Sequence, residues 1–273
     1  SLNIPPNDPI SVSVEVQCPM TQMVKGQQLP FSRWSRKHIK AICFHPPPLT
    51  KRHPMQTVTR DTHAKIKTYI NKTLKPLLSL PAPIQADVWW RIQFRMLPVS
   101  YKFVFMQNTN PRVLECSYPE CVAVETMKHV LYECRFVNPV WRWHQGAWRV
   151  FGVSFAWTTI ENLDEFQVAP QWSSHLSIIC RLWVLLVAGL LRDLWIHRNK
   201  SKFENKPVPY IKAVTEVSMV SWSANVRRWI RDPTTTEDDK NMIQYLLQTL
   251  QTHENYAWFW LKYPRAFTIP TCS

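Results

Sequence analysis

Three cysteines and one histidine lie close together in this 273-residue chain, at Cys116, Cys121, His129 and Cys134. Four, seven and four residues separate successive members. Thiolate sulfur and imidazole nitrogen are the ligands of closed, four-coordinate zinc sites, and three cysteines with one histidine are a usual set. The spacing therefore predicts a structural Zn²⁺ site, and we name these four residues the Cys3His group. The alternative is a surface histidine beside small, buried, apolar cysteines.

The elements that hold such a group can be predicted from the spacing. A short proline-containing loop would present Cys116 and Cys121, and a helical turn would present His129. Five residues of helix rotate a side chain roughly 140° beyond a full turn, so Cys134 cannot continue the same helix and still face His129. We expect the helix to end near Glu133 and the chain to turn back.

The periodicity of apolar residues predicts an all-α fold. Only four glycines against 22 prolines argue against a dinucleotide-binding or all-β fold. Pro76 is predicted to end the first helix, and a capping box is predicted to open a short helix at Thr158–Glu161. The other helices are expected over residues 59–74, 83–96, 99–107, 139–150, 174–202, 209–231 and 236–262. The core stripe of the second helix is predicted to be Ile84, Val88, Trp89, Ile92 and Met96.

Three parts are expected along the chain. Residues 1–56 form a proline-rich, basic and largely irregular extension, in which Ile10–Val16 alternates like a strand. Residues 57–150 form a helical zinc-knuckle domain, and residues 151–273 form a tryptophan-rich helical bundle. The helix over 174–202 is apolar on nearly all sides, which predicts a buried helix.

The distribution of charge indicates a polyanionic partner. The chain carries a net charge of +14, of which +10 falls between Phe31 and Lys75, whereas residues 151–273 carry +2. Lysine and arginine contact phosphates, and Trp34 among cations either stacks on an unpaired base or anchors the extension. The candidate contacts to nucleic acid are Arg33, Trp34, Arg36, Lys37, Lys51, Arg52, Lys65, Lys67, Lys72, Arg91, Arg95, Lys128 and Arg135.

No motif of an enzyme is recognisable in the sequence. It contains neither a Gly-x-Ser-x-Gly elbow nor a glycine-rich phosphate loop. The acids at 237–239 are predicted to cap the helix that follows Thr236. The most apolar run, Leu182–Leu191, is shorter than the roughly 20 residues that span a bilayer. We expect a non-catalytic intracellular, nuclear protein without a membrane partner.

Several short motifs together resemble a known family. The resemblance is to the zinc-binding region that follows the reverse transcriptase of non-LTR retrotransposons. It covers about residues 85–205 and is carried by Trp89–Pro98, the Cys116/Cys121 pair, Glu125-Thr126 before His129 and Cys134, Val140-Trp141, and Arg198-Asn199 near a helix end. It implies that the Cys3His group binds zinc. Four residues between the first two cysteines, where two are common in the family, imply a different loop shape.

What the family's polymerase needs is missing from this chain. There is no Tyr-x-Asp-Asp carboxylate pair for two metal ions, so the resemblance implies the tail of such an element or a protein derived from it. The leading hypothesis is a non-catalytic zinc-knuckle protein that binds RNA or DNA. The alternative is a protein-interaction scaffold that docks a partner or a second copy through its tryptophan-rich C-terminal helices. A third reading is a nuclease built from scattered acids.

Overall fold

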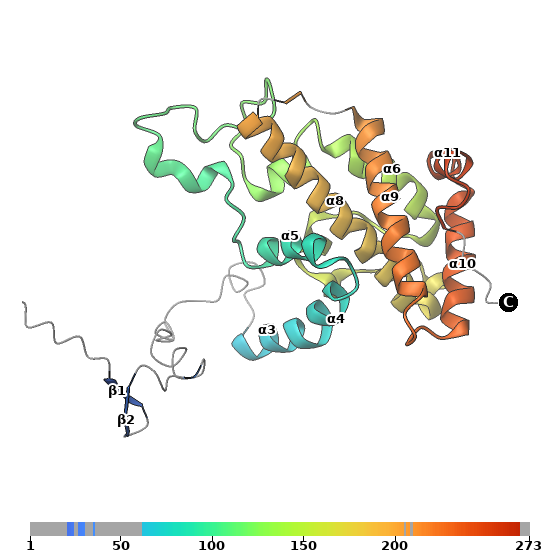
Figure 1. Ribbon diagram of the computed structural model, residues 1–273. Helices are drawn as coiled ribbons and strands as arrows, with labels where there is room; N and C mark the ends of the chain where they lie inside the picture. The colour runs from blue at the N-terminus through green and yellow to red at the C-terminus, as the bar shows by residue number, and fades with distance from the viewer. Residues whose placement is uncertain are drawn as a thin grey trace, which may run out of the picture. The chain divides into compact units, whose positions relative to one another are not determined.

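The computed structural model describes residues 21–24, 27–30, 35, 62–204, 206–207 and 210–267 (Figure 1). The chain divides into two compact units, Ser1–Arg52 and His53–Ser273. In the first unit, β1 (Thr21–Val24) pairs with β2 (Gln27–Pro30) as an antiparallel hairpin that the sequence reasoning missed. The strand predicted at Ile10–Val16 lies outside the described residues.

The second unit is helical, which confirms the predicted all-α class. Two five-residue π-helical turns, η2 (Ile70–Leu74) and η4 (His129–Glu133), interrupt or join the α-helices. The α-helices are α3 (His63–Tyr69), α4 (Lys75–Leu78), α5 (Pro83–Gln93), α6 (Asn138–Trp148), α7 (Trp157–Glu161), α8 (Leu176–Glu204), α9 (Ile211–Ile230), α10 (Glu237–Gln251) and α11 (Glu254–Lys262). The 3₁₀ turns are η3 (Ser100–Met106), η5 (Arg149–Phe151), η6 (Leu163–Glu165) and η7 (Pro170–His175).

Helix α8 is the centre of this unit and packs against α5 and α9 (Figure 1). Every residue from Leu182 to Leu191 is buried, as predicted for a helix that is apolar nearly all round. With its 3₁₀ lead-in, the helical segment Pro170–Glu204 is long and apolar enough to cross a membrane by length and composition. Of its most apolar window, 61% is buried inside the unit, as in the core helix of a folded domain.

The boundary predicted at residue 150 does not separate two domains, because residues on both sides share one core. The indole N–H of Trp148 on α6 donates to the Tyr256 hydroxyl on α11 at 2.9 Å. The indole N–H of Trp89 on α5 donates to the carbonyl of Ile160 at 2.8 Å. Both hydrogen bonds are buried. Each tryptophan therefore fills apolar space and also donates a hydrogen bond across the predicted boundary.

Two predicted helix ends are wrong for local reasons. The helical path continues through Pro76 to Leu78, because the wide turn of η2 comes immediately before the proline, whose ring cannot donate a hydrogen bond. The second helix ends at Gln93, three residues early, where Arg95 adopts a left-handed φ of 54°. Met96 therefore lies beyond the helix and is 64% exposed. Ile84, in the first turn of the helix, is 61% exposed, so neither residue belongs to the core stripe.

The capping predictions have mixed outcomes. Thr236 caps α10, accepting a hydrogen bond from the backbone N–H of Asp239 at 3.1 Å. The capping box at Thr158 is wrong, since α7 already begins at Trp157 and has no side-chain cap. The helix predicted over 236–262 is broken after Gln251, and His253 caps α11 through the backbone N–H of Asn255.

Candidate metal centre

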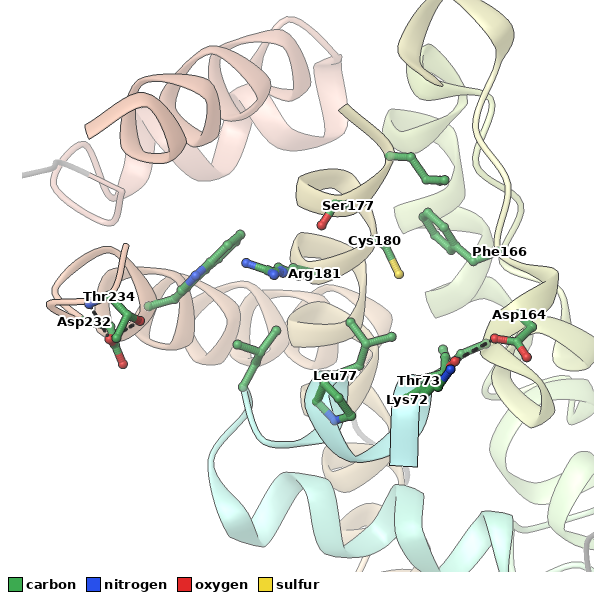
Figure 2. Close-up of a pocket in the computed structure, with 15 residues that line it drawn as sticks. Lys72, Thr73, Leu77, Asp164, Phe166, Ser177, Cys180, Arg181, Asp232 and Thr234 are labelled. Atoms are coloured by element: carbon green, nitrogen blue, oxygen red, sulfur yellow. Dashed lines mark hydrogen bonds between the residues drawn. The ribbon is translucent and has the colours of Figure 1, made fainter. Parts of the chain in front are cut away.

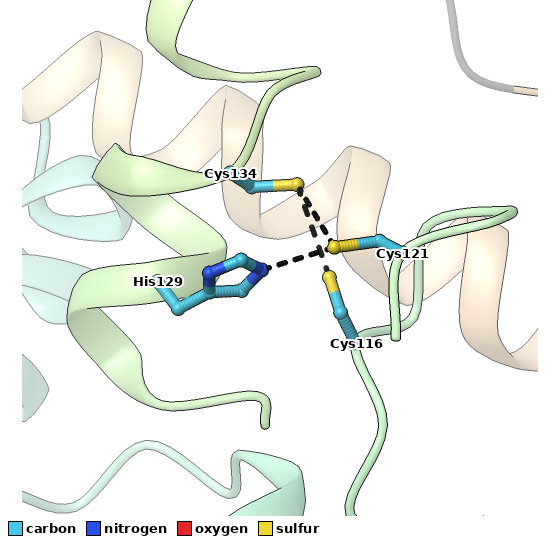
Figure 3. A group of neighbouring side chains, drawn as sticks. All are labelled: Cys116, Cys121, His129 and Cys134. Carbon is cyan, nitrogen blue, oxygen red and sulfur yellow. Dashed lines mark hydrogen bonds between the residues drawn. The ribbon is translucent and has the colours of Figure 1, made fainter. Parts of the chain in front are cut away.

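The four ligand atoms of the Cys3His group converge on one point (Figure 3). They all lie within 4.8 Å of one another. The Sγ atom of Cys134 is 3.9 Å from that of Cys116 and 4.0 Å from that of Cys121, and Cys121 Sγ is 3.3 Å from His129 Nε2. A disulfide would need a sulfur–sulfur distance of about 2.05 Å, so these are free thiols. The group could hold a metal ion.

A doubled-back loop presents the first two thiols. Cys116 donates its backbone N–H to the carbonyl of Ala123 at 2.8 Å, and Glu115 forms a β-bridge with Val124. Between the cysteines, Glu120 takes a left-handed φ of 58°. This conformation turns the chain within the four-residue gap, so the longer spacing still brings Cys121 to Cys116.

A single wide helical turn presents the other two ligands. The Thr126 hydroxyl accepts the backbone N–H of His129 at 3.0 Å and so supports the start of η4. The backbone N–H of Cys134 then donates to the carbonyl of His129 at 2.8 Å. Cys134 itself has a ψ of 136° and leaves the helix. The prediction that the helix ends near Glu133 is confirmed.

Hydrogen bonds to sulfur favour a thiolate in this group. Donation from the Cys116 thiol, together with the backbone N–H of Phe136, lowers the pKa of Cys134 to about 6 despite its burial. The same hydrogen bond and burial raise the pKa of Cys116. The pair thus shares one proton between two sulfurs. Thiolate is the form that a metal ion requires.

Beside the group lies a buried ion pair that the sequence reasoning did not identify. Glu125 is 0% exposed and Arg198, near the end of α8, is 1% exposed. Arg198 donates to both carboxylate oxygens, through Nε at 3.3 Å and through Nη2. The Arg198 guanidinium also lies over the Trp195 ring, 4.8 Å from its centre. Glu125 and Arg198 both lie in the motifs that carry the family resemblance, and these motifs were the signal for the pair in the sequence.

The Glu125 carboxylate also accepts hydrogen bonds from the metal-centre loop, which is the segment Cys116–Cys121. It accepts the backbone N–H of Ser117 at 3.0 Å and that of Ser100 at 2.9 Å, and both serine hydroxyls donate to it. Burial alone would raise the pKa of Glu125, but Arg198 and the two serines outweigh it and lower this pKa to about 2. Ser201 of α8 donates to the Ser117 carbonyl at 2.8 Å. The loop is therefore fastened to α8 by buried polar bonds.

The predicted nucleic-acid contacts fall into three sets. Lys65, Lys67 and Lys72 are exposed on α3 and η2. Four more are each paired with an acid: Arg91 with Asp87 (2.7 Å), Arg95 with Glu161 (2.7 Å), Lys128 with Glu133 (2.7 Å) and Arg135 with Glu120 (3.2 Å). The remaining six lie outside the described residues: Arg33, Trp34, Arg36, Lys37, Lys51 and Arg52.

Acidic residues do not form a second ligand cluster in the part of the chain that the structure describes. There, the Cys3His group is the only set of three or more histidine, cysteine, aspartate or glutamate side chains close enough to hold a metal ion. The three converging carboxylates that the nuclease reading needs are therefore not found among these residues.

Known proteins offer no relative for comparison. No protein-family model, no curated protein and no solved structure matches this chain. The resemblance to the retrotransposon region therefore remains a prediction from short motifs.

Proposed function

We propose that this chain is a non-catalytic zinc-knuckle protein of retrotransposon origin that binds nucleic acid. The distances within the Cys3His group are the observation that carries the zinc assignment. A tetrahedral Zn²⁺ with Zn–S bonds of about 2.3 Å places its sulfur ligands about 3.8 Å apart. Two of the sulfur–sulfur distances are 3.9 and 4.0 Å.

A structural role for the metal follows from the ligand count. Four protein ligands complete the tetrahedron and leave no position for water or substrate, unlike a catalytic zinc site. The ion would tie the Cys116–Cys121 loop to η4 and, through Cys134, to the chain entering α6. Binding free energy at such a site stabilises the fold directly.

Binding of nucleic acid is supported by the charge of the first helices. Residues 62–86 contain four lysines and no acid. Lys67 and Lys72 are exposed and form no ion pair with any described residue. Such side chains attract phosphates without regard to sequence, and the affinity falls as salt rises because bound counterions are released.

The test is a fluorescence anisotropy titration of the full chain with single- and double-stranded RNA and DNA at several salt concentrations. We expect log K to fall linearly with log salt. The double variant Lys67→Gln/Lys72→Gln should reduce the slope by about 1.4 to 1.8. Lys240→Gln is the matched control, because Lys240 on α10 already pairs with Glu237 at 2.6 Å. A flat salt dependence, or no binding at low salt, contradicts the proposal.

Protein interaction is the second candidate function. The sequence hypothesis placed the docking surface beside Trp222, Trp229 or Trp258 in the C-terminal helices. Trp222 and Trp229 are buried, at 0% and 7% exposed. Trp258, by contrast, is partly exposed, and Leu261 on the same helix is 83% exposed.

Exposed apolar side chains on η3 also favour protein interaction: Val104 is 58% exposed and Phe105 is 75% exposed. Sedimentation of the wild type and of Phe105→Ser distinguishes the cases, because a dimer through η3 would become a monomer in the variant.

A further inference from the structure

A cavity of about 600 Å³ is lined by none of the predicted site residues except Lys72. Four segments line it: residues 72–80, residues 163–166, the first turns of α8, and residues 229–234 at and beyond the end of α9 (Figure 2). Its volume falls within the range of about 300 to 1,000 Å³ that is usual for small-molecule sites.

Leucine side chains supply the aliphatic part of a lining that is mixed apolar and polar. They are Leu77, Leu80, Leu163 and Leu176. Its two aromatic residues, Phe166 and Trp229, are only 8% and 7% exposed. Neither therefore has an open ring face on which a nucleobase could stack. Leucine walls of this kind favour a flexible alkyl chain.

Two cations from different walls also line the cavity, Arg181 from α8 and Lys72 from η2. The Arg181 guanidinium lies over the Trp229 ring, with its carbon 5.8 Å from the ring centre. Figure 2 shows this guanidinium among the residues that line the space. The Arg181 side chain has no ion pair or hydrogen bond with another described residue, so its fork of donors is available to a carboxylate or phosphate.

The two acids at the cavity are already hydrogen-bonded within the protein. Asp164 accepts from the Thr73 hydroxyl at 2.9 Å. Asp232 accepts from the backbone N–H of Thr234 at 2.9 Å and from its hydroxyl at 2.6 Å. The Arg181 guanidinium, by contrast, has no hydrogen-bond or ion-pair partner among the described residues. The donors still open at this cavity are therefore those of a guanidinium, and these suit an anionic head group.

Covalent chemistry at this cavity is disfavoured. The one thiol on its wall belongs to Cys180, and burial raises the pKa of this thiol to about 12. The thiol stays protonated at neutral pH, and the protonated form is a poor nucleophile. Cys180 thus acts as one more apolar surface, and binding here is non-covalent.

We propose that this cavity binds a small alkyl carboxylate, with the head group at Arg181 and the chain along the leucine walls. The site is separate from the Cys3His group and shares only Lys72 with the predicted nucleic-acid contacts. An alkyl phosphate from a membrane lipid offers similar chemistry, and the experiment distinguishes this source from the free carboxylate.

The test is isothermal titration calorimetry of the full chain with octanoate and decanoate, each below its micelle concentration. We expect one site per chain. Each added methylene should raise the affinity about fourfold if the chain is buried. Decanol and decyltrimethylammonium should bind at least tenfold more weakly than decanoate, because neither accepts the charged hydrogen bonds of Arg181.

Two variants and a matched control locate the binding. Arg181→Gln should weaken decanoate binding at least tenfold. Ser177→Phe should abolish it by filling the cavity, since Ser177 lines the cavity, is exposed and makes no side-chain hydrogen bond with another described residue. Arg142→Gln, an exposed position on α6 outside the cavity, should change nothing. Thermal unfolding checks that each variant is folded.

Several results would overturn the proposal. Equal affinity for the three head groups, or no effect of either cavity variant in folded protein, would mean non-specific apolar binding elsewhere. Failure to bind decanoate would exclude the site. Binding to anionic phospholipid vesicles without binding to decanoate would assign the cations to a membrane surface instead.

Discussion

At the scale of single residues, Glu125 is the side chain on which the metal-centre loop and the longest helix both depend. Its two oxygens accept hydrogen bonds from Arg198 on α8, from Ser100 and from Ser117, the residue that follows Cys116. A buried carboxylate is tolerated only when paired and hydrogen-bonded in this way. The residue therefore couples the position of Cys116 to the position of α8.

Removing the charge of Glu125 should strongly destabilise the fold. Glu125→Gln leaves Arg198 buried without its counter-ion, and breaking a buried pair in this way costs about 3 to 5 kcal/mol. The control is Glu133→Gln, whose solvent-exposed pair with Lys128 should contribute much less to stability than the buried pair. Urea unfolding of both zinc-loaded variants measures the difference, and equal losses would contradict the structural role of Glu125.

The same carboxylate predicts how stability depends on pH. The pKa of Glu125 is lowered from 4.5 to about 2 in the folded chain. Its contribution is therefore complete above about pH 4.5 and is lost as the pH falls towards 2, by roughly 3 kcal/mol. The stability difference between the wild type and Glu125→Gln should shrink over this window. A difference that stays constant from pH 4.5 to 2.5 would disprove the assignment.

Loss of one thiol should remove the metal. Cys134→Ser takes away a buried ligand, and we expect the zinc content measured by mass spectrometry to fall from one ion per chain to much less than one. The midpoint of thermal unfolding should fall with it, because metal binding contributes to folding. Cys180→Ser, a partly buried cysteine outside the Cys3His group, should retain the ion. Full zinc content in Cys134→Ser would contradict the ligand set.

At the scale of elements, backbone conformation decides where several helices end. The local rules that identified α8 and α9 rest on periodicity, which extends over many residues. The ends depend on single residues: Arg95 in the left-handed region ends α5, and the wide turn before Pro76 lets a helix pass a proline. Such ends were the least accurate part of the sequence prediction.

Two glycines should respond in opposite directions to alanine. Gly189 lies within α8, and an added Cβ would sit 3.4 Å from the Ser221 hydroxyl, an ordinary contact. Gly189→Ala should stabilise the fold by up to about 1 kcal/mol through helix propensity. Gly152 has a φ of 72°, and a Cβ there would lie 2.7 Å from the Ala169 nitrogen, so Gly152→Ala should destabilise by at least about 1 kcal/mol. Chemical denaturation measures both, and the same sign for both would refute this.

At the scale of the whole molecule, residues 53–273 form one unit with one core. Tyr256 of α11 illustrates this, because its hydroxyl meets both His144 Nδ1 at 2.8 Å and the Trp148 indole N–H at 2.9 Å on α6. All three side chains are fully buried. Burial lowers the pKa of His144 to about 3, so this histidine remains neutral within the core at ordinary pH.

A fragment that ends at residue 150 should therefore not fold alone. It would expose the faces of α5 and α6 that α8, α9 and α11 cover. We expect residues 57–150 with zinc to show no cooperative thermal transition by circular dichroism, whereas residues 53–273 should show a single one. A cooperative transition in the short fragment would restore the predicted two-domain organisation.

The Cys3His group and the main helices were predictable because both are local. The Cys3His group spans Cys116 to Cys134, and helical periodicity repeats within a few residues, so nearby side chains carry the signal. Three other features depend on residues far apart in the chain: the pair of Glu125 with Arg198, the single core across residue 150, and the cavity between residues 72 and 234. Burial and packing bring those residues together, and no local pattern specifies which distant partners will meet.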